Sequence, residues 1–291
     1  MTRDLGEDDA AEDIVRAELK YLTRDPKYER EKPYEVYYDT RGTIPDTNMV
    51  NDVQPVLIRN FRPFQNSESL MVHGFSLQKI DCALTASEFR DDDKVKHIYY
   101  PVIETLLRRT YPKAAEIRVL EHETRKRHTK FPAVIAEDVN TKQPATVVHI
   151  DHSPYSAVRT SRKAFDIIQK QYRRLLTVTV WKSFQGPGND WPLAVCSSRS
   201  INHEQETIAA DVVFHDRFSE NVRLYHSPNH EWYYFKDLGS DEVLLFTQAD
   251  TDLEGRTGNS GVAHASFCNP LADEHAALRE SIELRAFLYF K

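Results

Sequence analysis

Short apolar runs, separated by Gly, Pro, Asp and Asn, recur along the second half of the chain. Runs of this length with turn residues between them are typical of strands rather than helices. Seven strands are expected, at residues 145–151, 175–184, 192–200, 230–235, 242–248, 262–267 and 281–290. So many short strands in succession indicate a sandwich, a jelly roll or a barrel.

The first half of the chain adds two strands and a helix, and a second helix lies among the later strands. Residues 53–59 alternate well enough for a strand, and residues 115–122 form the next one. Residues 91–109 carry apolar side chains at i, i+3 and i+4, with aspartates at the start and arginines at the end, as a helix dipole favours. Pro101 should kink or divide this helix, and the second helix is expected at 157–174. The fold is therefore mainly β, with helices that cover one face of a sheet.

Residues 1–51 differ from the rest because they are polar and rich in tyrosine, with three prolines that interrupt any long helix. A turn or two of helix is expected at 14–22. We interpret 1–51 as an N-terminal tail and arm that packs on the core, and 52–291 as the core domain.

The charge of the chain argues against two classes of partner. The net charge is −7, but the first thirteen residues hold six acidic side chains and one basic one, so the remainder is almost balanced. A nucleic-acid-binding protein should show a basic face, and a membrane-surface binder should show clustered Lys and Arg. We therefore expect neither nucleic acid nor a membrane as partner.

Other features of the sequence indicate a cytoplasmic protein. No run approaches the roughly 18–20 apolar residues of a membrane span, and the acidic start does not resemble a secretory signal. The three cysteines lie far apart, which suits neither a disulfide framework nor a metal knuckle. A reducing compartment fits this pattern.

The motif with the most chemical content is His149-Ile150-Asp151, in the strand expected at 145–151. Successive side chains of a strand alternate between its faces, so His149 and Asp151 share one face with Val147. If they point inward, these polar groups need a partner, and a divalent metal satisfies both. Two histidines and one carboxylate leave three coordination positions open on Fe(II). The alternative is a histidine at a strand end beside a surface aspartate.

The last strand also has one polar face. Its first half carries Arg279, Ser281, Glu283 and Arg285 on that face, whereas the opposite face is apolar throughout and should pack on the body of the fold. Such a face is often exposed to solvent. Beside a metal it can instead line a cavity, because arginine binds a carboxylate bidentately and a neighbouring hydroxyl completes the site.

A third metal ligand must come from a distant histidine, and His226, His230 and His264 are the main candidates. In a jelly-roll oxygenase the distal histidine should lie one strand before the arginine strand. His264 meets this condition, because it precedes Arg279 by 15 residues. No arginine-bearing strand promptly follows the other two.

Seven segments taken in order resemble the fungal AsaB-like hydroxylase/desaturase family of non-haem Fe(II)/2-oxoglutarate-dependent oxygenases, with its cephem-methoxylase-related and gibberellin-desaturase-like members. The segments are VHIDHS (148–153), VTVW (178–181), WPLAVC (191–196), HEWYYF (230–235), DEVLLF (241–246), HASF (264–267) and RESIELR (279–285). The resemblance covers about 53–290. The chain departs from the family at Lys182, Ser183 and Ser197, so no substrate is carried over from it.

The resemblance implies a double-stranded β-helix (a jelly roll, cupin-like) and a dioxygenase that uses Fe(II), 2-oxoglutarate as co-substrate and O2. By motif it implies His149, Asp151 and His264 as iron ligands. It also implies that Arg279 and Ser281 lie near the distal carboxylate of 2-oxoglutarate, although Arg285 is an alternative for the same role.

Five residues are further candidates for the substrate pocket: Arg159, Trp181, His230, Trp232 and Arg285. For the two tryptophans, ordinary core packing is the favoured alternative. The expected substrate is a small molecule, with a carboxylate or amino-acid-derived compound preferred. The expected outcome is hydroxylation, desaturation or oxidative ring closure of an unactivated C–H bond in specialised metabolism.

Two other functions stay open from the sequence. One is a metal-dependent oxidase or isomerase on the same fold that does not use 2-oxoglutarate. The other is a non-enzymatic β-sandwich binding module, in which His149 and Asp151 pair structurally. The sequence also leaves open the oligomeric state, a homodimer included.

Overall fold

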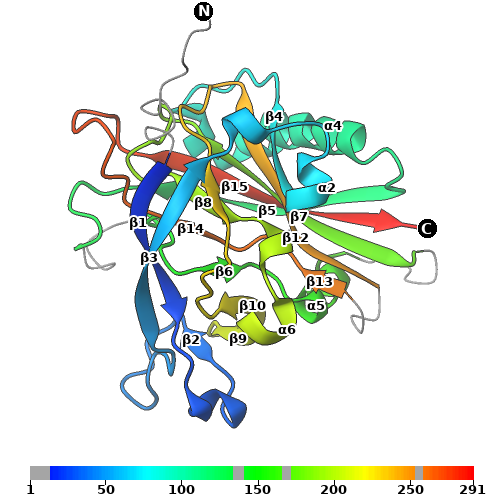
Figure 1. Cartoon of the computed structure of the whole chain (residues 1–291). Helices are drawn as coiled ribbons and strands as arrows, with labels where there is room; N and C mark the ends of the chain where they lie inside the picture. The colour runs from blue at the N-terminus through cyan, green and yellow to red at the C-terminus, as the bar shows by residue number, and fades with distance from the viewer. Residues whose placement is uncertain (1–13, 134–140, 166–171, 253–257) are drawn as a thin grey trace, which may run out of the picture.

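The computed structural model describes residues 14–133, 141–165, 172–252 and 258–291. Two curled sheets face each other across the interior (Figure 1). The larger sheet has nine strands in the order β1-β3-β11-β8-β14-β6-β10-β9-β2, and the smaller has the order β13-β12-β7-β15-β5, with β4 paired to β12. The predicted mainly β fold with flanking helices is confirmed.

The strands are β1 (Ile14–Leu22), β2 (Tyr34–Val36), β3 (Asn51–Asn60), β4 (Phe75–Lys79), β5 (Glu116–Lys126), β6 (His149–Ile150), β7 (Arg174–Ser183), β8 (Leu193–Cys196), β9 (Thr207–Val213), β10 (Phe218–Leu224), β11 (Trp232–Tyr234), β12 (Glu242–Asp252), β13 (Gly258–Ser260), β14 (His264–Ser266) and β15 (Glu280–Phe290). The α-helices are α2 (Ser69–His73), α3 (Asp92–Lys94), α4 (Tyr100–Thr110), α5 (Pro154–Ala164) and α6 (His203–Glu206). Short helical turns are η1 (Pro26–Glu29), η2 (Arg62–Phe64), η3 (Glu88–Arg90), η4 (Val95–Tyr99) and η7 (Ser198–Ser200).

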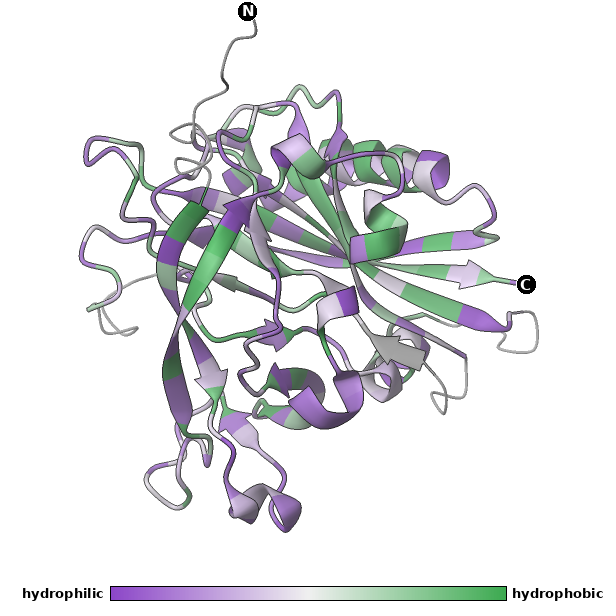
Figure 2. Cartoon of the chain, in the orientation of Figure 1, coloured by the Kyte–Doolittle hydropathy of each residue, from purple (hydrophilic) through white to green (hydrophobic). Residues whose placement is uncertain are grey.

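Helix α4 covers the outer face of the smaller sheet. Its apolar residues Ile103, Leu106 and Leu107 join one core with the apolar positions of β15, β7 and β12, and Figure 2 shows apolar residues concentrated along the strands beneath this helix. The π-helical turn η4 precedes α4, and Pro101 occupies the first turn of α4. The predicted helix is therefore divided just before this proline, which cannot donate a helical hydrogen bond.

Strand β15 alternates as its sequence predicts. Ile282, Leu284, Ala286 and Leu288 belong to the core under α4. The polar positions project to the other side, into the space between the two sheets. This alternation brings the charged half of β15 into the interior rather than to solvent.

The N-terminal segment forms a strand where a short helix was expected, so the helical expectation for 14–22 is wrong. Strand β1 pairs with β3 along its whole length, and Val15, Leu19 and Tyr21 alternate into a second core. Val15 and Leu19 fit both a helical and a strand period, whereas Tyr21 fits only the strand, which pairs with β3. Strand β1 also contacts the segment just before β6, because the carbonyl of Lys20 accepts a hydrogen bond from the backbone N–H of Val148.

Other expected boundaries also differ. Helix α5 begins at Pro154, where Ser153 caps the helix by accepting from the backbone N–H of Ser156. Phe165 is extended and ends it, and the later part of the predicted helix falls partly on 166–171, outside the described residues. No helix in the described ranges has the length and apolar character that a membrane crossing needs.

Candidate metal centre

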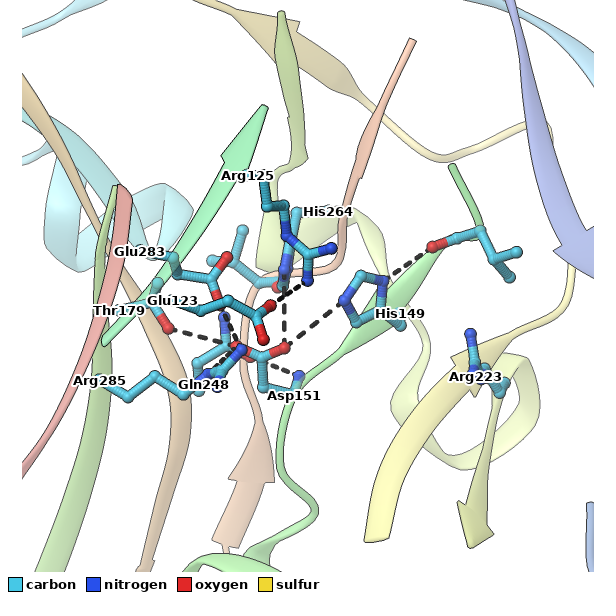
Figure 3. A network of polar contacts seen from close by, with 12 residues as sticks. Glu123, Arg125, His149, Asp151, Thr179, Arg223, Gln248, His264, Glu283 and Arg285 are labelled. Carbon is cyan, nitrogen blue, oxygen red and sulfur yellow. Dashed lines mark hydrogen bonds and ion pairs between the residues drawn. The ribbon is translucent and has the colours of Figure 1, made fainter. Parts of the chain in front are cut away.

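Two histidines face each other across neighbouring strands of the larger sheet. His149 on β6 pairs directly with His264 on β14, so their side chains leave the same face of the sheet. Asp151 follows β6 and lies beside them (Figure 3). The intervening Ile150 and the preceding Val148 point to the opposite face and are fully buried in the core under β1. The alternation of this short strand therefore separates its polar from its apolar side chains.

The three polar side chains converge on one point. One ligand atom from each lies within 4.8 Å of the others, and Nε2 of His149 and Nε2 of His264 lie 3.5 and 3.8 Å from Oδ1 of Asp151. Nδ1 of each imidazole contacts the backbone carbonyl two residues earlier, at 2.7 Å for Val147 and 3.3 Å for Val262. These contacts favour a proton on Nδ1, which leaves each Nε2 lone pair free for a metal.

A divalent cation fits this donor set. Burial, together with the neighbouring His149, lowers the pKa of His264 to about 3, so this imidazole is neutral near pH 7. Burial alone would raise the pKa of Asp151, but Arg285 and the two histidines hold it well below its usual range. Nε2 of His264 is buried without a hydrogen-bond partner among the described residues. Two imidazoles and one carboxylate with open positions are typical of non-haem Fe(II) oxygenases.

Three further side chains hold Asp151, two through its carboxylate and one through its backbone N–H. Arg285 donates from Nε to Oδ2 at 3.0 Å, and the hydroxyl of Thr179 donates to the same oxygen at 3.4 Å. The backbone N–H of Asp151 donates to Oε1 of Gln248 at 2.7 Å. Gln248 lies where the pairing of β12 with β7 shifts register, and such a bulge redirects a side chain. Strands β7, β12 and β15 of the smaller sheet thus fix a ligand carried by the larger one.

Charged side chains in turn fix Arg285 (Figure 3). Its Nη1 donates to Glu121 at 2.9 Å, and its Nη2 donates to Glu283. Glu283 lies directly across from Glu123 of β5, which pairs with Arg125. Burial raises the pKa of Glu283. The pairing of acids and bases in this network holds the arginine in one orientation toward the metal centre.

Arg279 is a second buried cation between the sheets. The residue is only 1% exposed, and its guanidinium lies 4.9 Å from the ring centre of Trp181. Nε donates to the hydroxyl of Ser281 at 3.2 Å, and Nη1 donates to the carbonyl of Trp191 and the hydroxyl of Ser266 at 2.7 and 2.5 Å. These partners are neutral, and no carboxylate in the described ranges lies within ion-pair distance of the guanidinium. Burial lowers the pKa of Arg279 to about 9, so an anionic ligand would stabilise this charge.

The structure brings two of the five predicted pocket residues to this region. Trp181 lies against Arg279, and Arg285 contacts Asp151. Arg285 is engaged by three carboxylates, whereas Arg279 has none among the described residues, which favours Arg279 as the residue that binds a carboxylate co-substrate.

The other three predicted pocket residues lie elsewhere. Trp232 belongs to the core beneath strand β1 and donates to the hydroxyl of Tyr21 at 2.7 Å. The same hydroxyl lies 3.2 Å from Nδ1 of His230, so this histidine lies beside that core. Arg159 lies on the exposed side of α5, 3.8 Å above the ring centre of Phe218.

Sequence reasoning missed three residues near the centre: Thr179, Gln248 and Arg223. Arg223 pairs directly with His149 from β10, a strand that was not predicted. Its signal was present, because Val222 and Leu224 are apolar on either side of it and are buried in the core under β1.

The comparison with protein families gives one match over nearly the whole chain. The model described as "Oxidoreductase/YMDC permease-like domain" matches residues 19–289.

Curated fungal proteins are similar over most of their length. The alpha-ketoglutarate-dependent dioxygenase phiK of a fungal species is 28% identical over 273 residues, which cover 87% of this chain and 94% of phiK. The hydroxylase/desaturase efuI of Hormonema carpetanum is 28% identical over 276 residues, which cover 86% of this chain and 88% of efuI.

A solved structure shares the fold. The iron and alpha-ketoglutarate-dependent endoperoxidase NvfI superimposes with a TM-score of 0.80 at 24% identity, over 96% of this chain and 98% of that one. This likeness, with the two facing sheets, confirms the predicted double-stranded β-helix core.

Proposed function

The chain belongs to the oxidoreductase/YMDC permease-like domain family, and on this premise we propose that His149, Asp151 and His264 hold the Fe(II) of a 2-oxoglutarate-dependent dioxygenase. The enzyme class is that of its fungal relatives, and its reaction oxidises a small molecule of specialised metabolism. The observation that carries the assignment of ligands is the convergence of two imidazole Nε2 atoms and one carboxylate oxygen within 4.8 Å.

Arg279 is the proposed anchor for the distal carboxylate of 2-oxoglutarate. Within the described ranges its buried guanidinium meets only neutral oxygens, and Ser281 and Ser266 place two hydroxyls beside it. A charge-assisted hydrogen bond to this arginine would orient the co-substrate toward the metal ligands. Trp181 fixes the guanidinium plane from one side.

When bound, Fe(II) with 2-oxoglutarate and O2 supplies the oxidation of a C–H bond. The protein supplies position and the exclusion of water, since His264, Asp151 and Arg279 are nearly inaccessible to solvent. Arg285 and Thr179 keep Oδ2 of Asp151 engaged, so that Oδ1 faces the imidazoles. Hydroxylation, desaturation and oxidative ring closure are all compatible with this arrangement.

Calorimetry tests the assignment. We expect the protein to bind Mn(II), and 2-oxoglutarate to bind only after the metal. His264→Ala should abolish metal binding, whereas His275→Ala, at an exposed position, should not change it. Normal metal affinity in His264→Ala would contradict the proposed ligand set.

The same titration distinguishes the dioxygenase from the two other functions that the sequence leaves open. A metal-dependent oxidase or isomerase would bind Mn(II) but not 2-oxoglutarate, and a structural binding module would bind neither. The buried guanidinium of Arg279, which has no carboxylate partner in the part of the chain that the structure describes, argues against both. Succinate released in step with the consumption of 2-oxoglutarate would identify the dioxygenase reaction.

A further inference from the structure

Three side chains form a row across neighbouring strands of the larger sheet. His264 on β14 pairs with His149 on β6, and His149 pairs with Arg223 on β10. Directly paired residues project to the same face, so Arg223 lies beside the metal centre, next to His149 and on the side away from His264 (Figure 3). Nothing in the proposed iron and co-substrate site uses this arginine.

Arg223 is a buried cation with few partners. The residue is 6% exposed, and its Nη2 donates to Glu35 at 2.9 Å. Nε has no hydrogen-bond partner among the described residues. Glu35 lies on the edge strand β2, and its side chain is 36% exposed, so water weakens this ion pair. Removal of a guanidinium from water is costly unless the charge is paired, so a second anion would stabilise Arg223.

Asn221 adds a second unsatisfied group on the same face. It lies two residues before Arg223 on β10, and its Oδ1 is buried without a partner in the described part of the chain. Since Val222 pairs with Ile150, the register of β10 and β6 carries Asn221 toward position 151. The two side chains therefore present donors and an acceptor along one edge of the metal centre.

The exposure of the metal ligands indicates from which side a substrate arrives. The side chain of His149 is 14% exposed, whereas those of Asp151 and His264 are 8% and 2% exposed. Solvent therefore reaches the centre next to His149, which is the side of Arg223. Arg279 approaches from the other side, because its partner Ser266 lies two residues after His264 on β14.

We propose that Arg223 binds a carboxylate of the substrate at the edge of the metal centre, where Oδ1 of Asn221 is free to accept from a donor group of the same molecule. This inference rests on the proposed function, and it assigns the substrate to the organic acids. Arg279 and Arg223 would then hold the two carboxylates, that of 2-oxoglutarate and that of the substrate, on the His264 side and the His149 side of the ligand group. Before the substrate binds, Glu35 forms the ion pair with the guanidinium of Arg223.

A relaxation experiment with 4-fluorobenzoate as probe tests this site. Mn(II) replaces iron, and saturating 2-oxoglutarate fills the site at Arg279. We expect Mn(II) to enhance the fluorine relaxation of 4-fluorobenzoate but not that of the neutral 4-fluorobenzyl alcohol. Arg223→Gln should weaken binding of the benzoate at least tenfold, with unchanged affinity for Mn(II) and 2-oxoglutarate.

Two further variants complete the test. Arg199→Gln breaks an exposed Arg–Glu pair with Glu231 and should leave the relaxation unchanged. Glu35→Gln removes the carboxylate partner of Arg223 at a half-exposed position, so it should tighten binding of the benzoate even if Arg223→Gln fails to fold.

The outcomes distinguish this inference from the proposed function. If the wild-type protein binds no Mn(II), both are wrong. If Mn(II) and 2-oxoglutarate bind but the benzoate is not relaxed, or is relaxed equally in Arg223→Gln, only the assignment of Arg223 is overturned. Weaker binding in Glu35→Gln would also contradict it.

Discussion

Arg285 and Asp151 form an ion pair inside the protein, with Nε of the arginine 3.0 Å from Oδ2 of the aspartate. The second carboxylate oxygen, Oδ1, is the one nearest both imidazoles. The arginine thus selects which oxygen of Asp151 is free for a metal. Groups that orient a metal ligand in this way usually contribute about tenfold to a hundredfold to metal affinity.

Arg285→Met should therefore weaken Mn(II) binding by about tenfold to a hundredfold. The variant should also be less stable by about 3–5 kcal/mol, because it leaves buried carboxylates unpaired. Calorimetry and urea unfolding measure the two effects. Arg118→Met, which breaks an exposed pair with Glu116, is the matched control. Unchanged metal affinity in Arg285→Met would show that Asp151 needs no orienting partner.

Arg279→Lys should weaken binding of 2-oxoglutarate without a comparable effect on the metal. Lysine keeps the charge but loses the planar fork that reaches the carboxylate together with Ser281 and Ser266. Arg279→Ala should cost about 2–5 kcal/mol of 2-oxoglutarate binding, as for other buried charge pairs. Titration of 2-oxoglutarate into the Mn(II) protein checks both variants. Arg217→Ala, at an exposed side chain, should behave as wild type, and equal affinities throughout would exclude Arg279 as the anchor.

Tyr21→Phe should destabilise the protein but leave metal affinity unchanged. The hydroxyl accepts from Nε1 of Trp232 and lies beside His230. Its loss leaves a buried donor unpaired, at a cost of about 1–3 kcal/mol in urea unfolding. Tyr155→Phe, at an exposed position, is the control. A change in metal or 2-oxoglutarate binding would instead link this cluster to the active centre.

The stability of the metal-free protein should fall as the pH drops below about 6.5. Burial lowers the pKa of His230 in the folded state, so the unfolded chain binds its proton more readily. Stability therefore rises with pH through this range and is lost as the pH falls from the unfolded pKa toward the folded one. Urea unfolding at several pH values between 7 and 5 measures the slope. His230→Gln should give a shallower slope, and an identical slope would mean that other groups carry the effect.

The sequence predicted the centre better than its surroundings. Alternation along a strand is a local rule, so it placed His149 and Asp151 on one face and the apolar side of β15 against α4. The third residue of the group, His264, required the order of strands expected for a jelly roll, and the family resemblance then implied the same residue. The assignment of these residues as iron ligands stays a prediction that metal titration must test.

Long-range pairing explains what the sequence did not show. Whether 14–22 is a helix or a strand depends on β3, which pairs with it. Trp232 and His230 are aromatic and near the motifs, but they meet Tyr21 from the arm instead of the interior between the sheets. Arg223 comes beside His149 only because β10 pairs with β6. No spacing within the chain encodes these neighbours.

The hydrogen bond from the backbone N–H of Val148 to the carbonyl of Lys20 has a practical consequence. Strand β6 is only two residues long, so this hydrogen bond from β1 is one of few that hold the backbone at His149 in position. A fusion partner or tag that strains the chain near Ile14 would act on the same strand. Metal occupancy, rather than yield or solubility, is then the sensitive measure of whether an engineered version of this protein is intact.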